Sequence, residues 1–205
     1  MRSGVVELGC GSGPLRRHLV AAGHEVIATD ASPGMLALAR WTAPDARSVL
    51  RVALHNDGIP DADAIVGLGH ALNYLADAES LDRTLVAIAS ALRPGGVLAI
   101  DLCDLEWGEL RRDAPGAGRM GEDRAIVTKF SVPRPDRFVR QIATLLPNAD
   151  GSWCRDDERH DNVLIDTSRV PELLAEHGVE ATIDSSFGSE RLPDGLYAIK
   201  GTRGG

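Results

Sequence analysis

Three glycines at alternate positions near the start of the chain constrain its fold more than any other feature. Gly9, Gly11 and Gly13 follow an apolar run at residues 5–8, and residues 14–22 after them place leucines on one helical face. The pattern predicts a strand, a tight turn and a helix. Because glycine tolerates positive φ, the turn can bring a polar ligand close to the amides at the helix N-terminus.

Two families of nucleotide-binding folds use this arrangement. The dinucleotide fingerprint G-x-G-x-x-G does not fit, since the third glycine comes one residue early and Pro14 takes the last position. The stretch from Glu7 to Gly13 instead resembles the first motif of the class I S-adenosylmethionine-dependent methyltransferases. A second hallmark, Leu-x-Pro-Gly-Gly, stands at residues 92–96. The resemblance implies an α/β fold with a doubly wound, Rossmann-like sheet of seven mostly parallel strands. S-adenosylmethionine is then the cofactor and S-adenosylhomocysteine the product.

The cofactor contacts are expected around the glycine loop and the strand that follows. Apolar residues 25–29 end at Asp30, whose carboxylate can accept hydrogen bonds from both ribose hydroxyls, as the acid at this place does in the family. Capping of the next helix is the alternative for Asp30. By resemblance Met35 and Asp57 lie near the adenine, although core packing and a solvated turn stay equally open for them. The predicted cofactor-binding residues are Glu7, Gly9, Cys10, Gly11, Gly13, Asp30, Ala31, Met35, Asp57 and Leu68.

Polar side chains follow the fourth predicted strand, residues 63–67. In the family this loop lies beside the transferred methyl, which makes His70, Asn73 and Tyr74 candidates for facing the substrate. The alternative is that Asn73 caps and Tyr74 packs. Farther on, His160 lies in an acidic segment, where alternate side chains of a strand point to opposite faces, so no metal site is expected. We expect His70 and Tyr74 to position the substrate and His160 to act as the base.

The sequence pattern changes after residue 102. Segments 125–130, 138–145 and 152–160 alternate apolar and polar residues and are separated by turn sequences. They predict an antiparallel β-meander at about 124–164, inserted after strand five of a single domain that spans 1–205. The meander is expected to cover the substrate, to contact a second subunit, or both.

Composition limits the partners. The formal net charge of −8 gives no basic surface, which argues against nucleic acid as a partner and favours a small-molecule substrate. The three scattered cysteines predict reduced thiols and a cytoplasmic protein. No apolar run reaches the roughly 18 residues of a membrane span, and residues 1–4 show no signal pattern, so neither membrane insertion nor export is expected.

The predicted activity is transfer of a methyl group to an oxygen or nitrogen of a small molecule by in-line displacement. Such a reaction chiefly requires that the reacting atoms be aligned and water excluded. Two alternatives remain. The fold could bind the cofactor structurally or use it for a rearrangement without methylation, and, less favoured, the chain could be an NAD-dependent oxidoreductase.

Overall fold

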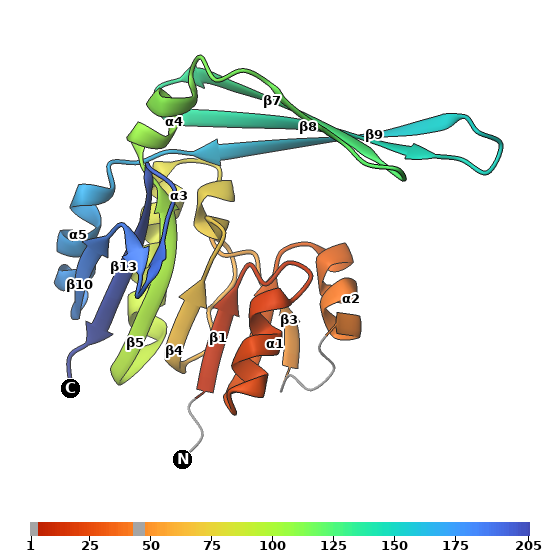
Figure 1. Ribbon diagram of the computed structural model, residues 1–205. Coiled ribbons are helices and arrows are strands. Elements are labelled where there is room, and N and C mark those ends of the chain that lie inside the picture. The colour runs from red at the N-terminus through yellow and green to blue at the C-terminus, as the bar shows by residue number, and fades with distance from the viewer. Residues whose placement is uncertain (1–3, 43–47) are drawn as a thin grey trace.

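A seven-stranded sheet flanked by helices forms the body of the protein, and a four-stranded antiparallel sheet lies across one end of it (Figure 1). The computed structural model describes residues 4–42 and 48–205. Residues 1–3, at which no export signal is predicted, lie outside the described residues, as do residues 43–47. No helix within the described part of the chain is both long and apolar enough to cross a bilayer.

The large sheet has the strand order β10-β13-β5-β4-β1-β2-β3, and β13 alone runs antiparallel to its neighbours. The predicted Rossmann-like, mostly parallel sheet is therefore confirmed. Its strands are β1 Gly4–Leu8, β2 Glu25–Asp30, β3 Ser48–Arg51, β4 Ala62–Gly67, β5 Leu92–Cys103, β10 Val179–Asp184 and β13 Leu196–Arg203, and the helices around it are α1 Pro14–Ala21, α2 Pro33–Thr42, η1 Ala71–Tyr74, α3 Ala78–Ala91, η2 Thr167–Arg169 and α5 Val170–Glu176.

The core of the body lies between the sheet and α3. Leu81, Leu85 and Ile88 recur on one face of this helix and are fully buried against the sheet, as their spacing predicts. One boundary differs from the expectation. Residues 93–96 were expected to form a turn before strand five, but β5 already begins at Leu92, which pairs with Ala62, and an irregularity in the register between Ala62 and Ala64 takes up the extra residues.

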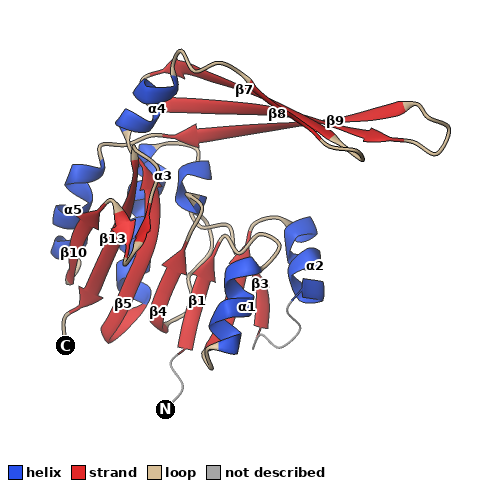
Figure 2. Cartoon of the chain, in the orientation of Figure 1, coloured by secondary structure: helices blue, strands red, loops and turns tan. Residues whose placement is uncertain are grey.

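The inserted meander after strand five is also confirmed (Figure 2). Its strands are longer than predicted, and a short fourth strand precedes them: β6 Ala117–Met120, β7 Ala125–Arg134, β8 Arg137–Pro147 and β9 Trp153–Val163. A short hairpin, β11 Ser186–Phe187 and β12 Glu190–Arg191, stands before β13. The meander crosses the carboxyl ends of the parallel strands, where open α/β sheets bind their ligands.

The helix α4, Leu105–Arg111, joins β5 to the meander and was not predicted from the sequence. Its central Gly108 disfavours a helix by propensity alone. In the structure this glycine is buried, and a Cβ atom there would come within 2.6 Å of Leu164 Cδ1. Close packing against the meander side of the molecule therefore explains the glycine. Asp104 caps the helix by accepting a hydrogen bond from the Glu106 amide.

Candidate active site

The glycine loop connects β1 to α1 in backbone conformations that only glycine adopts readily. Gly9, Gly11 and Gly13 have φ values of 64°, 52° and 90°. A Cβ on Gly9 would come within 2.5 Å of Ala71 Cβ, whereas the place of a Cβ on Gly11 has no heavy atom within 4 Å. The loop is therefore pressed against the β4–η1 segment at Gly9 and leaves open space at Gly11.

Asp30 fixes this loop from the end of the neighbouring strand β2. Its Oδ2 accepts a hydrogen bond from the Gly11 amide at 2.9 Å, and its Oδ1 accepts one from the Ser32 amide at 2.8 Å. Asp30 thus anchors the approach to α2 and also lines the cavity described next, while its contact with the ribose stays a prediction. A carboxylate has about four acceptor positions, so two remain for a ligand.

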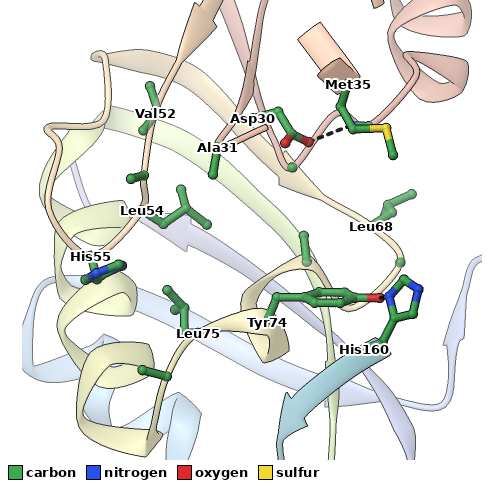
Figure 3. A pocket seen from close by; sticks show the side chains of 16 residues that line it. Asp30, Ala31, Met35, Val52, Leu54, His55, Leu68, Tyr74, Leu75 and His160 are labelled. Carbon is green, nitrogen blue, oxygen red and sulfur yellow. Dashed lines mark hydrogen bonds between the residues drawn. The ribbon is translucent and has the colours of Figure 1, made fainter. Parts of the chain in front are cut away.

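A cavity of about 590 Å³ opens beside this loop, within the size range of small-molecule sites. Figure 3 shows Asp30 and Met35 on one side of it and Tyr74 and His160 on the other. The lining comes from the carboxyl ends of β1, β2 and β4, from α2, from the turn after β3 and from η1 with the two residues after it, and His160 comes from β9. The residues that line the cavity are Gly9, Gly11, Asp30, Ala31, Met35, Val52, Ala53, Leu54, His55, Leu68, Gly69, Ala71, Tyr74, Leu75, Ala76 and His160.

Six of the predicted cofactor residues line this cavity: Gly9, Gly11, Asp30, Ala31, Met35 and Leu68. Glu7 and Cys10 are buried beneath it, and Gly13 ends the loop as the N-cap of α1. Asp57 accepts a hydrogen bond from the Ala53 amide at 2.7 Å, so its carboxylate shapes the turn after β3. The cavity wall in that turn is formed by Val52 to His55 instead, which the sequence analysis did not single out.

An adenosyl cofactor fits these residues. The backbone at Gly11 is open, Asp30 keeps free acceptor positions for ribose hydroxyls, and Met35, Val52 and Leu54 give apolar walls for a flat base. The carboxylate matches the ribose diol of such a ligand, the apolar walls match its aromatic base, and the open backbone at Gly11 lets the ligand approach the loop.

Glu7 lies at the end of β1 under the glycine loop and is 3% exposed. Burial raises the pKa of its carboxyl to about 7, and the positive charge of Arg16 opposes only part of that rise. Its Oε2 has no hydrogen-bond partner among the described residues. The glycine-loop side of the cavity therefore has one buried carboxyl group whose raised pKa lies near neutral pH.

The β4–η1 loop holds His70 in a left-handed conformation with φ 49°. Asp101, at the end of β5, fixes this loop, because its two carboxylate oxygens accept hydrogen bonds from the Gly69 amide at 2.9 Å and the His70 amide at 2.6 Å. Burial raises the pKa of Asp101, although both amides oppose the rise. The sequence analysis did not identify Asp101 as the anchor of His70.

Asn73 is buried and does not face the cavity. Its Nδ2 donates hydrogen bonds to the carbonyls of Val163 at 2.6 Å and Cys103 at 3.2 Å, and its Oδ1 accepts one from the Cys103 amide at 2.9 Å. The alternative of a structural role thus describes Asn73. By joining η1 to β5 and to the end of β9, it fixes the meander over the cavity.

The Tyr74 and His160 side chains contact each other on one side of the cavity, although 86 positions separate them in the chain (Figure 3). The Tyr74 hydroxyl is 2.9 Å from His160 Nδ1, and His160 Nε2 is 3.1 Å from Glu158 Oε2. If the Nε2 proton is donated to Glu158, Nδ1 accepts from the phenol. The geometry provides a chain of three groups along which a proton can move.

His70 stacks beside Tyr74, with ring centroids 5.8 Å apart, and lies 6.1 Å from the ring of Trp107 on α4. Burial, together with the nearby charges of Arg140 and His160, lowers the pKa of His70 to about 4. His70 is therefore neutral near pH 7. It does not line the cavity itself, in contrast to Tyr74 and His160.

The acidic segment of β9 is explained by pairing on its exposed side. Arg155 binds Asp157 at 2.7 Å and Arg159 binds Asp161 at 2.8 Å, each across two positions of the strand. His160 and Glu158 point to the other face, as the alternation of a strand requires. No cluster of three metal-ligating side chains occurs within residues 4–42 and 48–205.

Comparisons with known proteins agree with this geometry. A family model described as a methyltransferase domain matches residues 5–96. The chain is 39% identical over 211 residues to a trans-aconitate 2-methyltransferase of Variovorax paradoxus (strain S110), covering 95% of this chain and 73% of that protein.

Two solved structures share the fold. An S-adenosylmethionine-dependent methyltransferase from Clostridium acetobutylicum ATCC 824 superposes with a TM-score of 0.85 at 17% identity, covering 98% of this chain and 84% of the other. CalS10 with bound SAM, an amino pentose methyltransferase from Micromonospora echinaspora, gives 0.76 at 22% identity, covering 98% and 84%.

Proposed function

Since the chain belongs to the class I S-adenosylmethionine-dependent methyltransferases, we propose that it methylates an oxygen or nitrogen atom of a small molecule. One observation carries the proposal: a single cavity joins the glycine loop and Asp30 to the Tyr74–His160 pair. The first end suits a nucleoside and the second suits an acceptor whose proton must be bound or removed.

S-adenosylmethionine supplies a methyl group already activated by a positively charged sulfur. The protein then has to bind the cofactor and the acceptor, align their reacting atoms and exclude water. Asp30 would accept hydrogen bonds from the ribose hydroxyls. The adenosyl group would pack against the open backbone at Gly11, and Met35 and Leu54 would cover the adenine. These assignments follow from the cavity lining and from the free acceptor positions of Asp30.

The acceptor lies against Tyr74 and His160. Tyr74 orients the nucleophilic atom. An acceptor that arrives as a phenol or an ammonium takes the place of the Tyr74 hydroxyl at His160 Nδ1, and that nitrogen removes its proton, while Glu158 stabilises the resulting imidazolium. His70 stays neutral and holds the Tyr74 ring by stacking, so it is a positioning residue.

The meander has two proposed roles within a single domain of residues 1–205. It covers the acceptor, because β9 contributes His160 to the cavity, and its outer face joins two copies of the chain, because large apolar side chains such as Val127 and Trp153 are half exposed there. Light scattering tests the second role: a monomer at 100 μM or an unchanged mass for Trp153→Ser would contradict it.

The acceptor class is tested with methyl-labelled cofactor. The similar proteins are a methyltransferase of an acid, trans-aconitate, and one of an amino pentose, so the panel contains trans-aconitate, amino sugars, phenols and primary amines. We expect label in at least one acceptor with the wild type and a loss of at least 100-fold with His160→Ala. If S-adenosylmethionine binds and no acceptor in any class is labelled, structural use of the cofactor or a rearrangement replaces this proposal.

A further inference from the structure

Two buried N–H donors on the meander lack hydrogen-bond partners among the described residues: Arg140 Nε and Asn162 Nδ2. Asn162 is 2% exposed and Arg140 is partly buried. A buried donor without a partner loses its hydrogen bonds to water and forms no protein hydrogen bond in their place, and native structures contain few such donors. An unpaired guanidinium is the more costly of the two, since its charge is desolvated as well.

Strand register places both donors on the face of the meander that carries His160. Arg140 pairs directly with His160, and Phe138 pairs directly with Asn162, and directly paired residues point to the same face. Arg140 and Asn162 are thus diagonal neighbours. His160 contacts Tyr74 from this face and is the meander residue that lines the cavity. The two donors do not line the cavity themselves, but they lie on the same face of the meander next to His160.

The electrostatic effect of Arg140 agrees with this placement. Burial lowers the pKa of His70, and the positive charge of Arg140 adds to that effect; burial also raises the pKa of Cys103 at the end of β5, and the charge of Arg140 opposes that rise. Both residues lie at the carboxyl ends of the central strands. The guanidinium therefore acts on the groups that surround the reacting end of the site.

The other arginines of β7, β8 and β9 all have partners. Arg134, Arg155 and Arg159 bind the carboxylates of Asp136, Asp157 and Asp161, and Arg137 donates to the Ala76 carbonyl. Arg140 alone in these strands has no hydrogen bond or ion pair within the described part of the chain. With a net charge of −8, the protein has more carboxylates than cationic side chains. An arginine without a carboxylate partner on the His160 face of the meander is therefore a specific feature.

We propose that Arg140 and Asn162 bind an oxyanion of the methyl acceptor, a carboxylate or a phosphate, and thereby select anionic acceptors. The inference rests on the proposed function, because it names a property of the acceptor of that reaction. The planar guanidinium fork matches both oxyanions, and the amide adds a third donor. Trp107 and Phe138, whose ring centroids are 6.1 Å apart, lie beside these donors and provide an apolar wall for the rest of the acceptor.

The test uses calorimetry on the full chain saturated with S-adenosylhomocysteine. The probes are benzoate, succinate, phenyl phosphate and the neutral benzamide. Arg140→Gln removes the charge, Arg140→Lys keeps it without the fork, and Arg159→Gln is the matched control on the opposite face of the meander. Dissociation constants for S-adenosylhomocysteine are measured first for every variant.

We expect at least one anionic probe to bind the wild type 10-fold or more tightly than benzamide. Arg140→Gln then weakens that probe by about 10- to 100-fold, since a charge-assisted hydrogen bond is lost, Arg140→Lys has an intermediate effect, and Arg159→Gln has none. Whether benzoate and succinate or phenyl phosphate binds more tightly identifies the oxyanion as carboxylate or phosphate.

Three results would overturn the inference. They are binding of every anion no tighter than benzamide, unchanged anion binding in Arg140→Gln, and an equal loss of S-adenosylhomocysteine affinity in that variant, which would assign the arginine to the carboxylate of the cofactor. Failure of S-adenosylhomocysteine to bind the wild type would instead contradict the proposed function, so the two failures are distinguishable.

Discussion

The two ends of the cavity are built by different means. The nucleoside end uses backbone, glycines and one carboxylate, all within the first 76 residues and each next to the end of a parallel strand. The proposed acceptor end brings Tyr74 of η1 together with His160 of β9, which only the docking of the meander makes neighbours. In the proposed function, binding of the cofactor therefore depends on a local motif and selection of the acceptor depends on long-range packing.

The electrostatics of the two ends differ as well. Glu7, under the nucleoside end, has a raised pKa and loses its charge when protonated near neutrality, whereas His70, at the acceptor end, has a lowered pKa and stays neutral. In both cases burial is the main cause, since it disfavours the charged form of any group. Substitutions can therefore separate the two ends by affinity, rate and pH dependence.

The largest expected effect separates the ends by rate. His160→Ala should lower methyl transfer by about 10²- to 10⁴-fold because it removes the group that accepts the proton, and Tyr74→Phe should lower it less because the ring remains. Neither should change the dissociation constant of S-adenosylmethionine more than twofold. Single-turnover assays with Arg159→Ala as the control measure this, and a His160→Ala enzyme at the wild-type rate would remove the histidine from the mechanism.

A smaller effect tests the packing of the glycine loop. Gly9→Ala puts a side chain both in a left-handed conformation and against Ala71, so we expect it to lower the free energy of unfolding by about 2 to 4 kcal/mol. Gly23→Ala is the matched control, because Gly23 also has positive φ but has no heavy atom within 4 Å of a Cβ; about 1 kcal/mol is expected there. Equal losses in urea denaturation would show that the loop does not press on η1.

The smallest expected effect is the pH dependence of the free energy of unfolding that the buried groups His70 and Glu7 cause. The unfolded chain protonates His70 near its ordinary value of 6.5 and the folded chain only near 4, so His70 costs stability as pH falls through that window. Glu7 does the opposite, because its carboxyl is protonated up to about pH 7 when folded and only to about 4.5 when unfolded, and it costs stability as pH rises through that window.

Urea denaturation of His70→Asn and Glu7→Gln at pH 5 and pH 7.5 measures both slopes. Asparagine tolerates the left-handed conformation of residue 70. Relative to the wild type, His70→Asn should gain about 1 to 2 kcal/mol on going from pH 7.5 to pH 5, and Glu7→Gln should lose about as much. Parallel pH profiles for the three proteins would show that neither group is titrated as its burial implies.

Much of the body of the fold was predictable because its signals are local. The glycine loop and the acid that ends β2 each require particular residues at particular backbone positions. The alternation of β7 to β9 predicted the meander for the same reason. The helix α4 was missed because Gly108 is explained only by its contact with Leu164, a residue far away in the chain.

Less of the site was predictable, and the misses are informative. For Asp57 the sequence left an adenine contact and a solvated turn equally open, and in the structure its carboxylate accepts a hydrogen bond within its own turn. Val52 and Leu54, which line the cavity, have no distinctive sequence signal. Arg140 is one of several arginines in an alternating strand, and only the register of β8 with β9 sets it beside His160. The predicted roles of His70, Tyr74 and His160 remain predictions, although their side chains do come together.

The central claim is that the glycine loop and Asp30 bind the cofactor independently of the meander. Calorimetric titration of S-adenosylmethionine into wild type, Asp30→Ala, His160→Ala and the exposed-residue control Asp61→Ala tests it most directly. The account predicts a dissociation constant about 10- to 100-fold higher for Asp30→Ala, as expected from lost hydrogen bonds to a charged group, and values within twofold of wild type for the other two. An unchanged constant in a folded Asp30→Ala protein, or a loss in His160→Ala as large as that in Asp30→Ala, would contradict it.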